Sequence, residues 1–428
     1  MATKTINVDE LIHEDRVRGA IYSDPDIFAM EMDKIFMRNW VFICHDSQVE
    51  QPGDYFTTWL GKAPIIVSRG ADDGQVHIFY NRCMHRGNIV CQYESGNANY
   101  FRCAYHGWTF TNQGKVAGVP YKEAYGDRLN WNEMGLMPVK VGVYNGCVFA
   151  SGSENVAPIE EWVGNAGYYL DLFVNQGPAG IRVKAGSQKA LYRGNWKFQN
   201  ENDADNYHTD FTHAIGAVLR SLRARKAGEA IGRLGQPPEA IVRYLGNGHS
   251  ANHRTGVTDN RDMYAQAKGN SLTKGYVETL ETKYGVEGAR EWLRNAGAPG
   301  NTFRMWPNLV VIGTQFRITR PVSVGVAENY YYPSLLKDVP DEVNAIRLRF
   351  HEQGFGPAGF TSPDDVEVFA RNQIGLQANT AWDWQVMARG FHREQTADDG
   401  TLFSEVKDET GMRHIYTDEW RREMSAVD

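Results

Sequence analysis

CMHRG at residues 83–87 and CAYHGW at residues 103–108 are the stretches that decide how this chain folds. They place one cysteine and one histidine in each of two loops, as C-x-H and then, seventeen residues later, C-x-x-H. Two thiolates and two imidazoles bind either tetrahedral zinc or a [2Fe–2S] cluster in which histidines replace two cysteines at one iron. Structural zinc sites usually pair like ligands at short spacing, which these loops do not do. The spacing therefore favours the iron–sulfur cluster, and the four ligands expected for it are Cys83, His85, Cys103 and His106.

The sequence around these loops, from about Trp40 to Gly152, consists of short β-rich runs separated by glycine-containing turns. The expected strands are Tyr55–Leu60, Ile65–Ser68, Val76–Tyr80 and Cys147–Ser151. This pattern predicts a compact all-β domain over residues 40–152.

The later part of the chain mixes helical and strand patterns. Leu309–Phe316 and Val324–Tyr332 are expected to be antiparallel neighbours, because Arg320-Pro321 interrupts the run between them. Val339–Glu352 is amphipathic and helical. Strands grouped together and followed by helices indicate an α+β fold rather than a parallel α/β sheet. The expected parts are an N-terminal helical segment over residues 1–39 that packs on the larger domain, the β domain over residues 40–152, and the larger domain over residues 153–428.

Composition narrows the class of protein. The chain has 428 residues and a formal net charge of −7 without a basic patch, so we expect neither a nucleic-acid nor a membrane partner. Residues 1–18 are polar, and no apolar segment is long enough to cross a bilayer. The five cysteines are few and odd in number, which argues against a disulfide framework and for a reducing, cytoplasmic location.

A second group of metal-ligand residues follows in ENDADNYHTDFTH, residues 201–213. Its histidines, His208 and His213, are five positions apart and do not share the face of a regular helix, so the pair alone is weak support for a site. The carboxylates beside them are costly to bury unless a cation compensates their charge. If one metal binds both histidines, the segment must be a distorted turn or the irregular start of a helix.

Together these motifs resemble those of the Rieske-type aromatic-ring-hydroxylating oxygenases. The two loops match the family's C-x-H-R-G and C-x-Y-H-G-W hallmarks, except that Ala104 stands where many members have proline. Residues 201–213 match its E-N-x-x-D-x-Y-H-x4-H motif, and residues 356–365 resemble its G-P-A-G-x4-D-D element. Respiratory Rieske proteins carry an additional cysteine in each loop, but those positions are Asn88 and Tyr105 here, so their disulfide cannot form. The likeness is greatest to the benzoate, salicylate and terephthalate group.

This resemblance implies a fold and two cofactors. The fold is a Rieske [2Fe–2S] domain inserted in a larger catalytic domain, whose curved antiparallel sheet is flanked by helices. The second cofactor is a mononuclear Fe(II) bound by His208, His213 and Asp365, the facial triad of two histidines and one carboxylate. An alternative for Asp365 is that it and Asp364 cap the helix expected after them.

The resemblance also implies roles for residues near the iron. Asp205 and Asn202 are the expected catalytic residues, and Asp205 would link His208 to His106 of the partner subunit in a ring-shaped oligomer. The residues expected around the substrate are Asn202, Asp203 and Phe355.

A carboxylated substrate would need an arginine for bidentate pairing, and Arg304 and Arg317 are the candidates. Both arginines could equally be surface or intersubunit residues.

The implied activity is that of a terminal oxygenase component. It would take electrons from NAD(P)H through a ferredoxin or a flavin reductase, or both, and use O2 to hydroxylate an aromatic ring. The expected reaction is cis-dihydroxylation or hydroxylation of an aromatic carboxylate, with a small β subunit in an α3β3 assembly. The alternatives are a dioxygenase of neutral or polycyclic arenes, a mono-oxygenase or demethylase of the same superfamily, and a pure Rieske electron-transfer protein.

Overall fold

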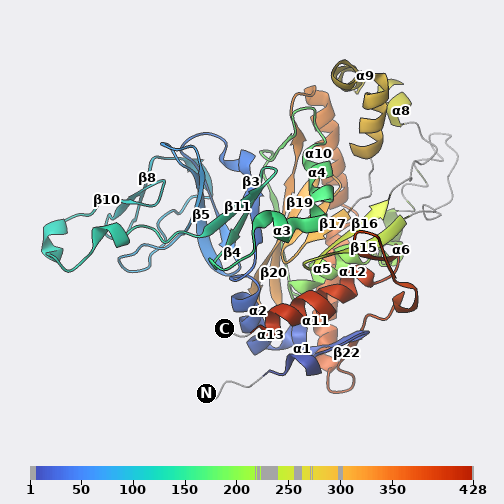
Figure 1. Ribbon diagram of the computed structural model, residues 1–428, viewed down its shortest axis with the longest axis horizontal. Coiled ribbons are helices and arrows are strands. Elements are labelled where there is room, and N and C mark those ends of the chain that lie inside the picture. Colours follow the sequence, from blue (N-terminus) through green and yellow to red (C-terminus); the bar gives the residue numbers. More distant parts are fainter. Residues whose placement is uncertain are drawn as a thin grey trace. The chain divides into compact units, whose positions relative to one another are not determined.

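Antiparallel sheets occur in both units into which the chain divides (Figure 1). This computed structural model describes residues 6–216, 218, 222, 240–254, 263–269, 271, 273–296 and 302–426. The small unit is Met32–Trp162, and the large unit comprises Met1–Glu31 and Val163–Asp428. The boundaries expected near residues 40 and 152 stay predictions, since these units are defined by packing rather than by function.

The small unit contains three antiparallel sheets. The first has the order β6-β5-β4-β7, with strands Val76–Tyr80, Ala63–Arg69, Asp54–Leu60 and Ser95–Asn97. The second has the order β11-β12-β3, with strands Lys140–Tyr144, Cys147–Ser151 and Val41–His45. The third has the order β10-β9-β8, with strands Val116–Gly118, Thr109–Thr111 and Tyr100–Arg102. The four strands expected from the sequence are all confirmed here.

Burial explains why these segments form strands. Every residue of β12 is buried, because β12 is the central strand of its sheet and is covered on both faces. A separate core lies beneath the cysteine–histidine loops, and both Cys83 and Cys103 belong to it. Trp108 and Phe110 supply much of its apolar volume. The two loops are therefore seated on packed side chains.

The large unit is built on a nine-stranded sheet in which every neighbouring pair is antiparallel. In sheet order its strands are β14 (Gln188–Tyr192), β20 (Val326–Pro333), β19 (Gln315–Ser323), β18 (Leu309–Ile312), β17 (Thr302–Met305), β16 (His249–Arg254), β15 (Ala240–Gly246), β24 (Leu402–Glu405) and β23 (Gln395–Thr396). Three helices position the site: α5 (Lys197–Ala204) contacts β17, α10 (Asp341–Phe355) contacts β20, and α11 (Ser362–Gly375) contacts β14. The α+β fold is thus confirmed. None of the helices in the described ranges is both long and apolar enough to span a membrane.

One strand prediction is wrong. Leu309–Phe316 is not a single strand, because the chain reverses at Gly313 between β18 and β19, which pair with each other. Gly313 has a φ of 62°, which a tight hairpin turn requires. Pro321 does not end a strand either. It lies within β19, where the register shifts between Pro321 and Ser323, and such a bulge tolerates the missing N–H.

Glu31 attaches the N-terminal residues to the large unit. Its carboxylate accepts hydrogen bonds from Lys197 Nζ at 2.6 Å, Trp196 Nε1 at 2.9 Å and Trp420 Nε1 at 2.9 Å. Glu31 and Lys197 are both fully buried. A buried carboxylate is tolerated here because a cation and two indole N–H groups compensate it.

Candidate metal centres

An interruption of helical structure brings two histidines together in the large unit. Helix α5 ends at Ala204, and Asp205 adopts extended backbone angles before the four-residue helix α6 (Thr209–Thr212) begins. His208 precedes α6 and His213 follows it, so their ring centroids lie 5.3 Å apart. The irregular segment expected from the five-residue spacing is confirmed.

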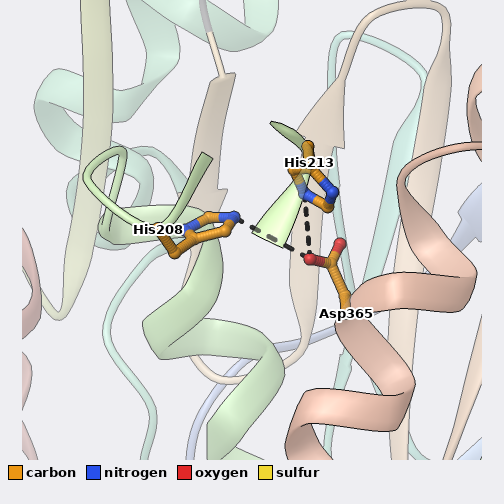
Figure 2. Close-up of side chains that lie close together, drawn as sticks. All are labelled: His208, His213 and Asp365. Carbon is orange, nitrogen blue, oxygen red and sulfur yellow. Dashed lines mark ion pairs between the residues drawn. The ribbon is translucent and has the colours of Figure 1, made fainter. Parts of the chain in front are cut away.

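Both imidazoles turn Nε2 toward one carboxylate oxygen (Figure 2). Asp365 Oδ1 lies 3.8 Å from His208 Nε2 and 3.1 Å from His213 Nε2. One candidate ligand atom from each of the three residues lies within 4.8 Å of the other two. Two imidazole nitrogens and a carboxylate oxygen in this arrangement are the donor set of a facial-triad iron site.

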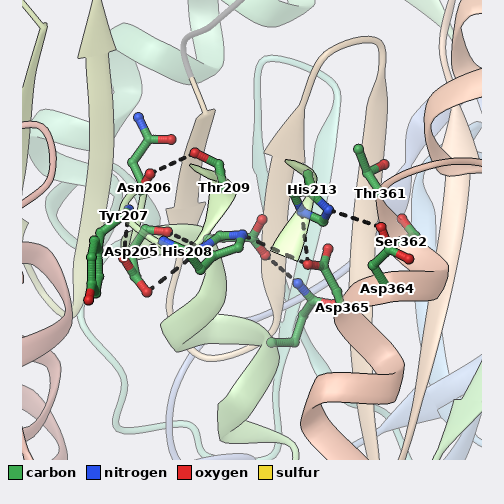
Figure 3. A network of polar contacts seen from close by, with 12 residues as sticks. Asp205, Asn206, Tyr207, His208, Thr209, His213, Thr361, Ser362, Asp364 and Asp365 are labelled. Atoms are coloured by element: carbon green, nitrogen blue, oxygen red, sulfur yellow. Dashed lines mark hydrogen bonds and ion pairs between the residues drawn. The ribbon is translucent and has the colours of Figure 1, made fainter. Parts of the chain in front are cut away.

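The other ring nitrogens face acceptors, as Figure 3 shows. His208 Nδ1 donates to the backbone carbonyl of Asp205 and lies 3.7 Å from Asp205 Oδ2. His213 Nδ1 lies 3.5 Å from Asp364 Oδ2. These contacts leave Nε2 of each ring to point inward, as a metal-binding histidine requires.

Asp365 lies in the first turn of α11, and its backbone N–H donates to the carbonyl of Thr361 at 3.1 Å. Its side chain turns inward rather than capping the helix: Asp365 is 4% exposed, and Oδ1 has no hydrogen-bond partner among the described residues. A buried carboxylate oxygen without a donor is costly unless a cation binds it. The residues present therefore fit a divalent metal at this point.

The electrostatics around the histidines agree with this fit. Burial lowers the pKa of His208, but the hydrogen bond to Asp205 and the negative charges of Asp365 and Asp205 raise the pKa above its ordinary value overall. The two aspartates thus favour a positive charge at this point.

Arg317 lies in a buried polar region near Asp365. It is 1% exposed, its Nη1 lies 3.6 Å from Asp203 Oδ1, and its Nη2 donates to Ser362 Oγ at 3.3 Å. Its guanidinium also lies 5.6 Å from the centre of the Phe355 ring. Within the described residues, Arg317 Nε has no hydrogen-bond partner. Arg317 Nε is thus a buried donor that no described residue satisfies.

His351 and Gln315 are also buried in the large unit. None of their side-chain nitrogen and oxygen atoms has a hydrogen-bond partner in the part of the chain that the structure describes. Burial and the charge of Arg317 lower the pKa of His351 to about 4, so its ring is neutral at pH 7.

The second candidate arginine is fully engaged by the protein. Arg304 donates from Nε to Ser250 Oγ at 2.5 Å, from Nη1 to the Asn200 carbonyl at 3.1 Å and from Nη2 to the Gly411 carbonyl at 2.7 Å. Every nitrogen of its guanidinium is thus used within the fold. Asn202, also expected at the site, is half-buried on α5.

The cysteine–histidine loops of the small unit have matching backbone turns. Gly87 N–H donates to the Cys83 carbonyl at 2.9 Å, and Gly107 N–H donates to the Cys103 carbonyl at 3.0 Å. Both glycines have positive φ, 73° and 72°, which glycine adopts without strain.

The four expected cluster ligands meet where these turns meet. The rings of His85 and His106 have centroids 4.5 Å apart, and Cys83 and Cys103 are buried free thiols. His85 Nδ1 is buried and has no hydrogen-bond partner in the described part of the chain. Two sulfurs, two imidazoles and this vacant nitrogen fit a Rieske cluster.

Several contacting residues were not found from the sequence. Asp364 faces His213, and Tyr125 Oη lies 3.5 Å from His85 Nε2. Asn88 Nδ2 donates to Cys103 Sγ at 3.7 Å. For Asp364, its place beside Asp365 in the G-P-A-G-x4-D-D element was the only signal, and it was interpreted as a helix cap. Tyr125 lies outside every motif, so no sequence signal marked it.

Comparisons with known proteins agree with this geometry. Residues 39–139 match the model of the Rieske [2Fe-2S] domain, and residues 159–426 match that of the ring-hydroxylating alpha subunit, catalytic domain. Toluate 1,2-dioxygenase subunit alpha of Pseudomonas putida is 34% identical, with 90% of this chain and 84% of that protein aligned. The 2-halobenzoate 1,2-dioxygenase large subunit of Burkholderia cepacia is 32% identical over 88% and 80% of the two chains. Naphthalene 1,2-dioxygenase with indole in its active site superposes with a TM-score of 0.80 at 26% identity, covering 98% of this chain and 95% of that one.

Proposed function

Because this chain belongs to the family of ring-hydroxylating oxygenase alpha subunits, we propose that it hydroxylates an aromatic carboxylate at a site formed by His208, His213 and Asp365. Enzymes of this family are aromatic-ring dioxygenases that contain a Rieske [2Fe–2S] cluster and a mononuclear non-haem iron. These cofactors supply one-electron transfer and the reduction of O2 for ring hydroxylation. A pure electron carrier has no need of the catalytic domain matched over residues 159–426.

The convergence of two Nε2 atoms on Asp365 Oδ1 is the observation that carries this assignment. His208, His213 and Asp365 would hold the iron. Asp205 keeps the proton of His208 on Nδ1 through its carbonyl oxygen, and Asp364 faces Nδ1 of His213. Cys83, His85, Cys103 and His106 would hold the cluster.

Asp205 has a second proposed role, which rests on the family resemblance. Its carboxylate would connect His208 to His106 of the partner subunit, so that the electron passes between copies of the chain. Asp205 is half-buried, and so is His106, which leaves both accessible for such a contact.

The proposed substrate class rests on Arg317 and on the relatives. The names of two relatives specify toluate and 2-halobenzoate, which are aromatic acids. Arg317 offers a buried N–H, and the nearest oxygen of Asp203 lies beyond hydrogen-bond distance at 3.6 Å. Asp203 itself accepts a hydrogen bond from Gln199 Nε2 at 2.5 Å. A substrate carboxylate at Arg317 would gain a charge-assisted hydrogen bond.

A neutral arene is the competing substrate class. It is favoured by relatives named for naphthalene and by Phe355, an apolar ring beside Arg317. Neutral substrates make no use of the Arg317 donor, so the two classes are separable by a substitution at this residue.

An anaerobic single-turnover experiment tests both the reaction and the substrate class. Both centres are reduced chemically, a panel of benzoate-like acids and neutral arenes is added, labelled O2 is admitted, and products are identified by mass spectrometry. We expect labelled oxygen in an aromatic acid. Products from neutral arenes alone would reject the carboxylate assignment and keep the oxygenase.

Arg317→Gln sharpens this test, with Arg320→Gln as the matched control. Arg320 is on the same strand and pairs with Glu328 at 2.7 Å. We expect Arg317→Gln to lower turnover of the acid by about 10- to 100-fold, the value of one charged hydrogen bond, while Arg320→Gln leaves it unchanged. Equal effects of the two substitutions would contradict a substrate contact at Arg317.

The proposal also includes the partner proteins and the cellular compartment of the enzyme. The relatives' names designate alpha or large subunits, and we infer a small β subunit in an α3β3 assembly, with a ferredoxin or flavin reductase, or both, supplying electrons from NAD(P)H. All five cysteines are free and buried, which supports a reducing, cytoplasmic compartment.

A further inference from the structure

The two cysteine–histidine loops differ at one equivalent position. The position is the fifth residue after each cysteine, which is Asn88 after Cys83 and Trp108 after Cys103. In both loops the backbone N–H of the cysteine donates to the carbonyl of this fifth residue at 2.8 Å. Their backbones are thus equivalent, but their side chains are an amide and an indole.

Each of these side chains reaches the opposite loop. Trp108 stacks on His85, with centroids 5.1 Å apart and planes 2° from parallel. Asn88 Nδ2 donates to Cys103 Sγ at 3.7 Å, within the range of hydrogen bonds to sulfur. The same nitrogen also donates to the Ile89 carbonyl at 3.0 Å, which fixes the direction of the amide. Only Asn88 of the two therefore places a hydrogen-bond donor on a ligand sulfur.

We propose that Asn88 raises the reduction potential of the Rieske cluster by donating a hydrogen bond to Cys103 Sγ. The inference rests on the proposed role of Cys103 as a cluster ligand. One-electron reduction adds one negative charge to the cluster and its ligands, without bond cleavage, and the electron comes from the proposed reductase partner. The sulfur of the reduced cluster is the stronger acceptor, so the amide stabilises the reduced form more than the oxidised form.

The family resemblance makes this position informative. In respiratory Rieske proteins the position of Asn88 is a cysteine bound in a disulfide. Here a disulfide is replaced by an amide that contacts the cluster loop of Cys103 directly. Asn88 thus acts on the reduction potential of the cluster, whereas a disulfide at this position joins the two loops covalently.

The experiment is a redox titration of the purified, cluster-loaded protein, followed by its visible absorption and by electron paramagnetic resonance of the reduced state. Asn88→Leu removes the donor at similar volume, and Asn88→Ala removes it with less bulk. Asn97→Ala is the matched control, because the Asn97 amide donates to the Pro52 carbonyl at 3.0 Å and to Asp54 at 2.9 Å but not to a sulfur.

We expect both Asn88 variants to retain the cluster signal and to show a lower midpoint potential. The expected decrease in the equilibrium constant for reduction is about threefold to tenfold, and tenfold corresponds to about 59 mV for one electron. Asn97→Ala should titrate like the unmodified protein.

Three results would overturn the proposal or its basis, and they can be told apart. An unchanged midpoint in cluster-loaded Asn88 variants rejects the tuning role and leaves the proposed function intact. Loss of the cluster in both variants also rejects it, because Asn88 would then hold the loop together. Absence of a Rieske spectrum in the unmodified protein would reject the proposed cluster ligands themselves.

Discussion

The two metal centres are built in opposite ways. The cluster loops lie close together in sequence, repeat the same backbone turn and rest on one local core in the small unit. The histidine–aspartate site takes its ligands from two distant segments, the two ends of α6 and the first turn of α11, each held by packing in the large unit. The first centre therefore depends on local conformation, whereas the second depends on the tertiary fold.

Substitution of Asp365 has the largest expected effect, because it should remove the mononuclear iron and leave the cluster in place. Asp365→Ala should abolish O2-dependent turnover, by roughly 1,000-fold or more, because it removes the carboxylate on which both Nε2 atoms converge. Metal analysis should show loss of the mononuclear iron and retention of the cluster irons. Glu367→Ala is the control, an exposed residue of the same helix that pairs with Arg371 at 2.9 Å. Simultaneous loss of both cofactors would contradict independent centres.

Asp364→Ala tests the residue behind His213. Removing the carboxylate that lies 3.5 Å from Nδ1 should weaken iron affinity by about 10- to 100-fold, as is usual for residues that orient a metal ligand. Iron binding is measured by competition with a chelator, with the cluster spectrum as internal reference. An unchanged affinity would show that packing alone orients His213.

The large unit should become less stable at alkaline pH, because His414 loses its proton there. Burial alone would lower the pKa of His414, but its hydrogen bonds to Asp418 and Glu394, both 2.8 Å, raise the pKa to about 9. The folded pKa exceeds the unfolded value of about 6.5, so the stabilisation is complete below pH 6.5 and is lost as the pH rises through 9. We expect the free energy of unfolding to fall by roughly 2 kcal/mol over this range. Thermal unfolding at both pH values checks this, and His414→Gln should show a flatter pH dependence.

Gly107→Ala should have the smallest effect, and it acts on the local centre. At a φ of 72° an alanine is strained, and its Cβ would meet Pro120 Cγ at 3.1 Å. We expect a loss of about 1 kcal/mol in stability and a lower cluster content. Gly118→Ala is the control, because nothing lies within 4 Å of its Cβ and its φ is not positive. Equal cluster content in both variants would show that the loop tolerates the strain.

The contrast between a local centre and one that depends on the tertiary fold also explains what could be predicted from the sequence. The cluster loops were found from a motif because the ligands and the turn glycines lie together in the chain. His208, His213 and Asp365 were marked by their motifs as well, but the approach of one Asp365 oxygen to both Nε2 atoms is visible only in the folded structure.

The roles of the two arginines could not be separated from the sequence. Val310 pairs with Arg304 on one side and with Arg317 on the other, so the two arginines lie in one cross-strand row. That register depends on the hairpin at Gly313, which was predicted as continuous strand. Only the structure shows that every guanidinium nitrogen of Arg304 donates a hydrogen bond within the protein, whereas Arg317 Nε has no partner among the described residues.

Glu31 ties together three stretches of the chain that are far apart in sequence. Two of its donors, Trp196 and Lys197, are neighbours near the middle of the chain, and the third is Trp420. Lys197 is the first residue of α5, and α5 leads to His208. A change at residue 31 or 420 therefore acts on the helix that carries the chain into the iron site, although neither residue lies at that site.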